Sequence, residues 1–408
     1  MASAAQAVVL VRDGQVVPCS VEAGAWLAQS PRGAYTTART VGGSSVFELT
    51  NHVNRLASSV RLMLEADCKE GKPGAAELQQ AYQHLGDPAQ LRPLIVSSLS
   101  AAVAAYRQHT CQAQLAQHAQ TPSKQSVVEG QHADNGDHRK GPSMQPPAAV
   151  GGHPASGLLG KPAGRTAVAV PAAAAPPAPP AAAAAAAAPT AATQASHPER
   201  PHQNGSAAVS DSAAEPPELK LTVLVTWEQE QGSHVWAHVS ALPARPRPPV
   251  KAQVRGAPRS NALAKDSEWV RQRKALEAGK PADVNEVLLA DPSGRVLEGS
   301  TSNFFAVVGG VVHTAGEGVL EGTVRAVALD VARREGIPVV LEAPRLQDID
   351  LWEGAFISST SRLVLPLDEL AAPEWDPPLI KQWPRDGTVA RLEQLVLQEI
   401  EAFSEPLR

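Results

Sequence analysis

Apolar residues in the first third of the chain predict two β-hairpins. Each consists of two short apolar runs around a tight turn: residues 7–11 and 15–17 around Asp13-Gly14, and residues 35–41 and 45–49 around Gly42-Gly43. Pairs such as Asp-Gly and Gly-Gly favour the two-residue turns that join antiparallel strands. An antiparallel sheet is therefore expected near the N-terminus.

The period of the apolar residues then changes to that of a helix. Residues 51–64 carry apolar side chains at positions 53, 56, 60 and 63 or 64, which places them on one helical face. Residues 91–106 form a second predicted helix, with Leu94, Val96, Leu99, Val103 and Tyr106 as its apolar positions.

Strands and helices continue in the second half of the chain. Two long apolar runs, 219–227 and 234–239, are predicted to pair as strands across a polar turn. The remaining predictions are strands at 286–289, 304–308, 311–313, 339–341 and 355–358 and a helix at 323–335. The fold class expected from this order is α/β (α+β), with two domains.

Between these halves lies a long segment rich in Gln, His, Ala and Pro. Proline interrupts helices and few large apolar side chains are present, so residues 112–217 are predicted to be a disordered insertion, with transient helix at most over 181–188. The predicted organisation is 1–111 for the first part of a small domain, 218–241 for its closing strands, 242–249 for a Pro-rich linker and 250–408 for a large domain.

Composition narrows the class of function. The formal net charge of -5 gives no basic surface for nucleic acid, and no apolar run is long enough to span a membrane. The three cysteines are far apart and the histidines show no ligand spacing, so neither a disulfide framework nor a metal site is predicted. The first residues have no basic segment typical of a signal peptide. A cytoplasmic protein is expected, with a plastid location as the alternative.

Five sequence motifs occur together in a recognisable order. They are Gly33-Ala-Tyr-Thr-Thr-Ala-Arg39, His52-Val-Asn-Arg-Leu-Ala-Ser-Ser59, the segment 291–305 with its Glu298-Gly and Ser-Asn-Phe-Phe, Glu321-Gly-Thr-Val-Arg325, and Phe356-Ile-Ser-Ser-Thr360. This pattern resembles the class IV aminotransferases, which bind pyridoxal 5'-phosphate (PLP) in the two-domain fold-type IV architecture of D-amino-acid aminotransferase. The sequence from Ala264 to Arg273 looks most like a plant and algal branched-chain-aminotransferase-like group.

The resemblance implies roles for individual residues. Lys265 would form the Schiff base with PLP, because it follows a small residue and precedes Glu298 in the order that the family shows. Glu298 would hold the protonated pyridine nitrogen, and Tyr35 would face the substrate carboxylate. The phosphate would be bound by Arg55 and Thr360 and by Gly322, Thr323 and Val324, where the start of the predicted helix offers free N–H groups.

Two other readings of nearby residues are rejected. The glycines at 316, 318 and 322 have GxGxxxG spacing, which is not the dinucleotide-binding GxGxxG pattern. His52 stands one helical turn before Arg55 and is expected to order it or to pack, not to act as an acid or base.

One segment departs from the family pattern. Class IV enzymes commonly place Asn shortly after the lysine, whereas this chain has Glu268-Trp269. Glu268 would either lie near the cofactor and influence substrate choice, or form a structural ion pair with Arg271 or Arg273. The second reading is favoured here.

Three functions are consistent with these motifs. The leading prediction is an aminotransferase, in which Lys265 carries the cofactor and moves the proton while an amino group passes from an amino acid to a 2-oxo acid. The alternatives are a PLP-dependent lyase resembling aminodeoxychorismate lyase, and an inactive descendant that serves as a binding scaffold. By resemblance, the active unit would be a homodimer.

Overall fold

Seven antiparallel strands form the first sheet, in the order β17-β4-β3-β5-β6-β1-β2. The computed structural model describes residues 7–120 and 217–407. The strands are β1 (Val8–Arg12), β2 (Gln15–Val17), β3 (Gly33–Val41), β4 (Ser45–Phe47), β5 (Leu219–Glu228), β6 (Gly232–Ala241) and β17 (Ser404–Pro406). Their hairpins β1–β2, β3–β4 and β5–β6 confirm the three predicted strand pairs. Positive φ angles at Asp13, Gly14, Gly42 and Gly43 give the first two turns the twist that antiparallel strands require.

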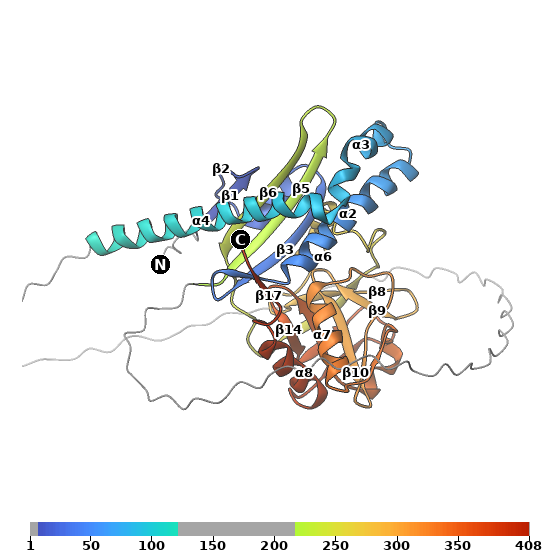
Figure 1. Cartoon of the computed structure of the whole chain (residues 1–408). Helices are drawn as coiled ribbons and strands as arrows, with labels where there is room; N and C mark the ends of the chain where they lie inside the picture. Colours follow the sequence, from blue (N-terminus) through green and yellow to red (C-terminus); the bar gives the residue numbers. More distant parts are fainter. Residues whose placement is uncertain (1–6, 121–216, 408) are drawn as a thin grey trace, which may run out of the picture. The chain divides into compact units, whose positions relative to one another are not determined.

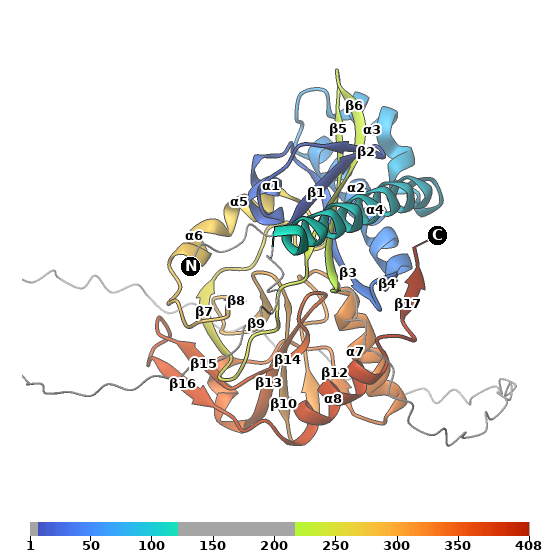
Figure 2. The same cartoon turned by 90° about the vertical axis from the view of Figure 1, so that its left-hand side faces the viewer.

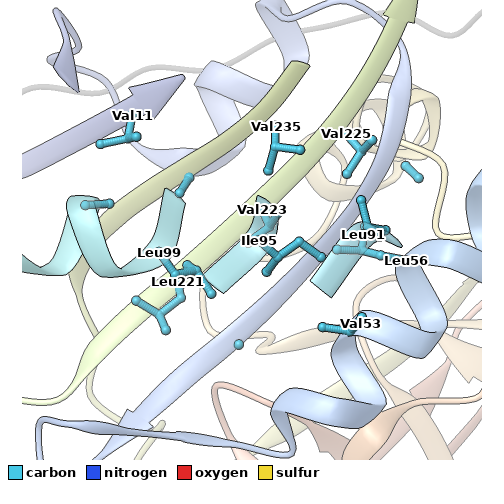
Figure 3. Close-up of a cluster of buried hydrophobic side chains, with 14 of the residues drawn as sticks. Val11, Val53, Leu56, Leu91, Ile95, Leu99, Leu221, Val223, Val225 and Val235 are labelled. Atoms are coloured by element: carbon cyan, nitrogen blue, oxygen red, sulfur yellow. The ribbon is translucent and has the colours of Figure 1, made fainter. Parts of the chain in front are cut away.

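Two helices cover one face of this sheet. They are α2 (Leu49–Lys69) and α4 (Pro88–Gln120), and α4 lies across the strands in Figure 1. Their buried side chains meet those of β1, β3, β5 and β6 in an aliphatic core, which Figure 3 shows. The buried side of α4 is formed by Leu91, Ile95, Leu99, Val103 and Tyr106.

The apolar face predicted for the second helix was therefore partly wrong. Leu94 is 47% exposed, and Val96 lies at the edge of the core. The buried residues have the spacing of an α-helix, as predicted. However, apolar residues also stand next to them in the sequence, so the predicted face was rotated by about one residue from the buried one.

The opposite face of the first sheet is only partly covered. Short helix α1 (Ala23–Gln29) packs there with α5 (Glu268–Gln272), in a small cluster that includes Trp26, Tyr35, Leu224 and Val270. Tyr35 and Leu224 are cross-strand partners in β3 and β5, so alternate residues of these strands point to this face.

The second sheet is mixed and has ten strands. Its main order is β12-β11-β10-β9-β8-β7-β15-β16, and β13 pairs with β10 and β14. The strands are β7 (Lys251–Gly256), β8 (Glu286–Ala290), β9 (Val296–Gly299), β10 (Asn303–Val308), β11 (Val311–His313), β12 (Val339–Val340), β13 (Trp352–Ser359), β14 (Leu363–Leu367), β15 (Glu369–Ala372) and β16 (Leu379–Gln382). All five strands predicted for this region and the predicted helix are present.

Helices α7 (Thr323–Arg334) and α8 (Gly387–Gln398) pack together against this sheet, as the view in Figure 2 shows. Their apolar side chains join Phe305 and Phe356, whose rings stack with centroids 4.4 Å apart. Each sheet therefore has its own buried core, and both sheets belong to one compact unit. The remaining helical segments are α3 (Ala75–Tyr82), α6 (Lys274–Ala278) and the 3-10 turns Gln83–Gly86 and Leu346–Leu351.

Some predicted boundaries differ from the structure. Leu49 begins α2 instead of ending a strand, because Glu48 adopts a left-handed conformation that ends β4. Helix α4 continues to Gln120, past the predicted start of the insertion, through a Gln- and Ala-rich stretch of good helix formers. The rest of the predicted insertion, including 181–188, lies outside the described residues. The domain limits themselves stay a prediction.

Candidate active site

A cavity of about 240 Å³ lies between residues of the two sheets. This is far more than the roughly 10–15 Å³ that one water molecule needs. All eight residues that the sequence analysis selected line it: Tyr35, Arg55, Lys265, Glu298, Gly322, Thr323, Val324 and Thr360. They come from β3, α2, β9, α7, the end of β13 and the segment before α5, so residues far apart in the sequence meet at one place.

Lys265 lies on an extended segment that is tied to the edge of the first sheet. Its carbonyl accepts a hydrogen bond of 2.9 Å from the N–H of Tyr35, and its own N–H donates to Ser59 Oγ at 3.0 Å. The lysine Nζ stands 4.7 Å from the centre of the Tyr35 ring. The backbone of Lys265 and its side-chain Nζ thus both lie beside Tyr35.

The environment favours the neutral form of this amine. Burial lowers the pKa of Lys265 to about 8, with further lowering by the charges of Arg55, Arg259 and Arg273, although Tyr35 opposes the shift. An amine with this pKa is a nucleophile near neutral pH, which an ordinary surface lysine is not.

Tyr35 is buried and surrounded by positive charge. Arg273 Nη1 donates to the Tyr35 hydroxyl at 3.4 Å. Burial alone would raise the pKa of this phenol, but the charges of Lys265, Arg273 and Arg259 together outweigh it and lower the pKa to about 8. The cavity therefore has a positive potential at the tyrosine.

Glu298 forms a buried, bidentate ion pair with Arg259. The Nε–Oε1 distance is 2.7 Å and the Nη2–Oε2 distance is 3.1 Å, and both side chains are less than a tenth exposed. The N–H of Leu320 donates to the same carboxylate at 3.1 Å. Burial raises the pKa of Glu298, and Arg259 opposes this shift. Arg259 in turn lies over the ring of Trp269, 5.4 Å from its centre.

Arg55 is a partly buried cation without an acidic partner among the described residues. Its Nη2 donates to Thr36 Oγ1 at 2.7 Å and contacts His52 Nδ1 at 3.1 Å, while Thr36 and His52 are 2.7 Å apart. Within residues 7–120 and 217–407, Arg55 forms no ion pair, and its buried Nε has no hydrogen-bond partner. Burial lowers the pKa of His52 well below its usual value, so His52 accepts the hydrogen bonds as a neutral ring.

The start of helix α7 completes this end of the cavity. Gly322 precedes the helix, and a Cβ atom there would stand 2.2 Å from Asn303 Oδ1, so only glycine fits without movement. Asn303 in turn donates from Nδ2 to the Leu320 carbonyl at 2.6 Å. Thr323 Oγ1 and Thr360 Oγ1 are 3.2 Å apart. The first amides of α7 have no acceptor within the helix and are available to an anion.

The sequence analysis missed a second acid beneath the cavity wall. Glu286 of β8 is buried and accepts hydrogen bonds from the hydroxyls of Ser300, Thr301 and Ser302 at 2.7–2.9 Å. It also forms an ion pair with Arg362, which donates to Thr301 as well. One carboxylate thereby holds a loop and an arginine that both line the cavity.

Four further cationic residues that line the cavity were not selected from the sequence: Lys220, Arg259, Arg273 and Arg362. Lys220 could have been selected because it is the one charged residue in the run 219–227, and a charge in a buried strand needs a partner. Nothing local distinguished the three arginines from surface residues. Glu268 does not line the cavity; it forms an ion pair of 2.7 Å with Arg271, which confirms the structural reading of that departure.

Neither a metal site nor a membrane span is present in the part of the chain that the structure describes. No group of three or more His, Cys, Asp or Glu side chains is arranged to hold a metal ion. Among the described helices, none has the length and apolar character needed to cross a membrane.

Comparison with known proteins agrees with this arrangement. Residues 199–370 match the family model of the class IV aminotransferases. The chain is 27% identical over 103 residues to the branched-chain-amino-acid aminotransferase of Pseudomonas aeruginosa, covering 25% of this chain and 34% of that protein. It is 31% identical over 142 residues to a D-alanine aminotransferase of Listeria monocytogenes, covering 34% and 43%. These matches thus span less than half the length of the curated relatives.

Solved structures match over nearly the whole chain. A branched-chain aminotransferase from Thermoproteus uzoniensis has a TM-score of 0.51 and 14% identity, covering 98% of this chain and 99% of the other. A hypothetical aminotransferase from Mycobacterium tuberculosis has a TM-score of 0.53 and 16% identity, covering 97% and 99%. At such identities the likeness shows the fold, which is that of the fold-type IV aminotransferases. The family match covers residues 199–370, so this part of the chain is similar to the class IV aminotransferases.

Proposed function

We propose that the protein is a PLP-dependent aminotransferase that transfers an amino group from an amino acid to a 2-oxo acid. The observation that carries this proposal is the position of Lys265. This partly buried lysine of lowered pKa shares one cavity with an ion-paired Glu298 and with Arg55, a cation that forms no ion pair among the described residues. The branched-chain and D-alanine aminotransferase names of relatives support the same class of reaction.

The residues present fit PLP. A buried guanidinium nitrogen without a partner and a helix start that admits only glycine are the features expected around a bound phosphate. Arg55, Thr323, Val324 and Thr360 would hold the phosphate. Glu298 would face the pyridine nitrogen, and Lys265 would carry the covalent bond.

Each residue then has a defined task. The bound cofactor supplies an electron-accepting ring for the amino acid. Glu298 would keep a negative charge near the ring nitrogen, and Arg259 stabilises this charge by holding the carboxylate with two hydrogen bonds. Lys265 Nζ would take a proton from the substrate Cα as a base and then, as an acid, deliver it to the C4' carbon of the bound cofactor, for which a pKa near the working pH is suited. Tyr35 and Arg273 offer hydrogen bonds to a substrate carboxylate.

An absorbance experiment tests the proposal. Purified protein is mixed with PLP, treated with borohydride and digested, and the labelled lysine is found by mass spectrometry. We expect a visible band in the wild type, trapped on Lys265, that Lys265→Ala abolishes and the exposed-lysine control Lys274→Ala retains. No band in the wild type, or label on another lysine, would contradict the proposal.

Amino-acid mixing then separates transfer from elimination. For an aminotransferase, an amino acid should convert the visible band to that of the aminated cofactor, and a 2-oxo acid should restore it. A lyase would release its product without needing the 2-oxo acid.

We further propose a homodimer, on the basis of the family resemblance. Light scattering of the purified protein measures this directly. A cytoplasmic or plastid location stays a prediction from the sequence.

A further inference from the structure

The cavity has more positive than negative charge. Of the described residues that line it, six are cationic and one, Glu298, is acidic. Glu298 is paired with Arg259, and Glu286 beneath the wall is paired with Arg362. Arg55 and Lys265 are accounted for by the cofactor under the proposed function, and Arg273 forms an ion pair with Glu277, which leaves Lys220.

Lys220 has no partner in the described part of the chain. It is a mostly buried residue of β5, and neither a hydrogen bond nor an ion pair of its side chain occurs within residues 7–120 and 217–407. Burial, more than any other factor, lowers its pKa, and Arg273 lowers it further, while exposed Glu22 opposes the shift. A cation in this position is costly unless an anion joins it.

A second polar group beside Lys220 also lacks a partner. Thr222 stands two residues further along β5, on the same face of the strand, and lines the cavity. Among the described residues, none forms a hydrogen bond with its buried hydroxyl. Arg273 donates a hydrogen bond of 3.4 Å to the Tyr35 hydroxyl and forms an ion pair of 3.0 Å with Glu277. Lys220, Thr222 and Arg273 all line the same cavity, which also has apolar lining residues such as Leu27 and Trp269.

We propose that Lys220 and Thr222, assisted by Arg273, bind an anionic group on the side chain of the substrate. The inference rests on the proposed function and names its substrate class. The site would prefer acidic amino acids and dicarboxylic 2-oxo acids to branched aliphatic ones. A branched aliphatic side chain would leave the Lys220 ammonium and the Thr222 hydroxyl desolvated and unpaired.

The competing explanation is that Lys220 binds the α-carboxylate, which every amino acid carries. The two differ in a measurable way. A side-chain site affects only acidic substrates, whereas an α-carboxylate site affects all of them equally.

The experiment compares half-reaction rates with racemic glutamate, aspartate, leucine and alanine, followed by cofactor absorbance. We expect kcat/KM for glutamate or aspartate to exceed that for leucine by at least about tenfold. Lys220→Met should lower kcat/KM for glutamate and aspartate by about 10- to 100-fold, which is the range for a lost hydrogen bond to a charged group. The same substitution should change kcat/KM for leucine by less than about threefold. Lys220→Arg should keep most of the preference. Equal losses for all four substrates, or a wild-type preference for leucine, would overturn the inference.

The control variant is Lys69→Met, which removes one exposed lysine at the end of α2 and should leave all rates unchanged. Calorimetry gives a second readout that needs no reaction. Glutarate should bind the wild type and Lys69→Met more tightly than butyrate does, and Lys220→Met should lose this difference. Retention of the difference in Lys220→Met would overturn the inference. If no amino acid changes the cofactor spectrum, the proposed function fails, and the glutarate comparison still decides whether the anion site exists.

Discussion

The ion pair between Arg259 and Glu298 offers a quantitative test of the site's construction. Replacing Arg259 by Met removes both guanidinium hydrogen bonds and leaves Glu298 buried with only the Leu320 N–H as a donor. Breaking a buried pair in this way typically costs about 3–5 kcal/mol, because one charge stays in a poorly solvating place. We expect the free energy of unfolding to fall by that amount at pH 8.

A double variant isolates the cause. Arg259→Met combined with Glu298→Gln removes both charges, and replacing a whole buried pair is often neutral. Its stability should return to within about 2 kcal/mol of the wild type, so that the two substitutions are strongly non-additive. Urea titrations of the four proteins, all without added PLP, give the required free energies.

The pH dependence has a defined sign. Without Arg259, burial of the Glu298 carboxyl is opposed only by the Leu320 N–H and the charge of Lys265, so the folded pKa rises further above the unfolded value of about 4.5. The stability contribution of such a group is fully present below pH 4.5 and is lost as the pH rises through the folded pKa. The destabilisation of Arg259→Met should therefore be small near pH 4.5 and complete at pH 8. Additive losses, or a cost independent of pH, would refute this reasoning.

Three further substitutions and titrations address other parts of the site. Gly322→Ala should weaken PLP binding at least about tenfold, because the new Cβ would stand 2.2 Å from Asn303 Oδ1. The control variant Gly24→Ala should leave PLP binding unchanged, because its Cβ would meet no atom within 4 Å. Fluorescence titration measures PLP binding by both variants. Glu286→Gln should lower the free energy of unfolding by about 3 kcal/mol, since it leaves a buried arginine uncompensated; an unchanged urea midpoint would contradict this. In cofactor-free protein, Lys265 should react with an amine reagent with an apparent pKa of about 8. The rate of this reaction should therefore rise between pH 7 and 9 and then level off. A rate that still rises above pH 10 would contradict the lowered pKa of Lys265.

The elements of the fold were largely predictable because their signals are local. Turn pairs such as Asp13-Gly14 and the three-to-four spacing within residues 51–64 act through neighbouring residues, and both predictions were confirmed. The exact buried side of α4 was less certain, because Leu94 and Ile95 are both apolar and only packing against the sheet selects one.

The candidate site was likewise predictable only in part from the sequence. The motifs around Tyr35, Arg55, Lys265 and Glu298 were recognisable from the sequence, and the structure brings all of them to one cavity. Their catalytic and binding roles remain predictions, since proximity does not establish a reaction.

The charge balance of that cavity was decided by tertiary structure alone. Arg259 and Glu268 look alike in sequence as charged residues near Lys265, yet one is buried against Glu298 and the other is paired at the surface with Arg271. Similarly, the sequence determines that Lys220 lies in a strand, but not whether that strand faces water or a cavity. Strand pairing and chain crossing set the distances between charges, and the electrostatic energy of a pair depends on its separation and burial and not on its spacing in the sequence.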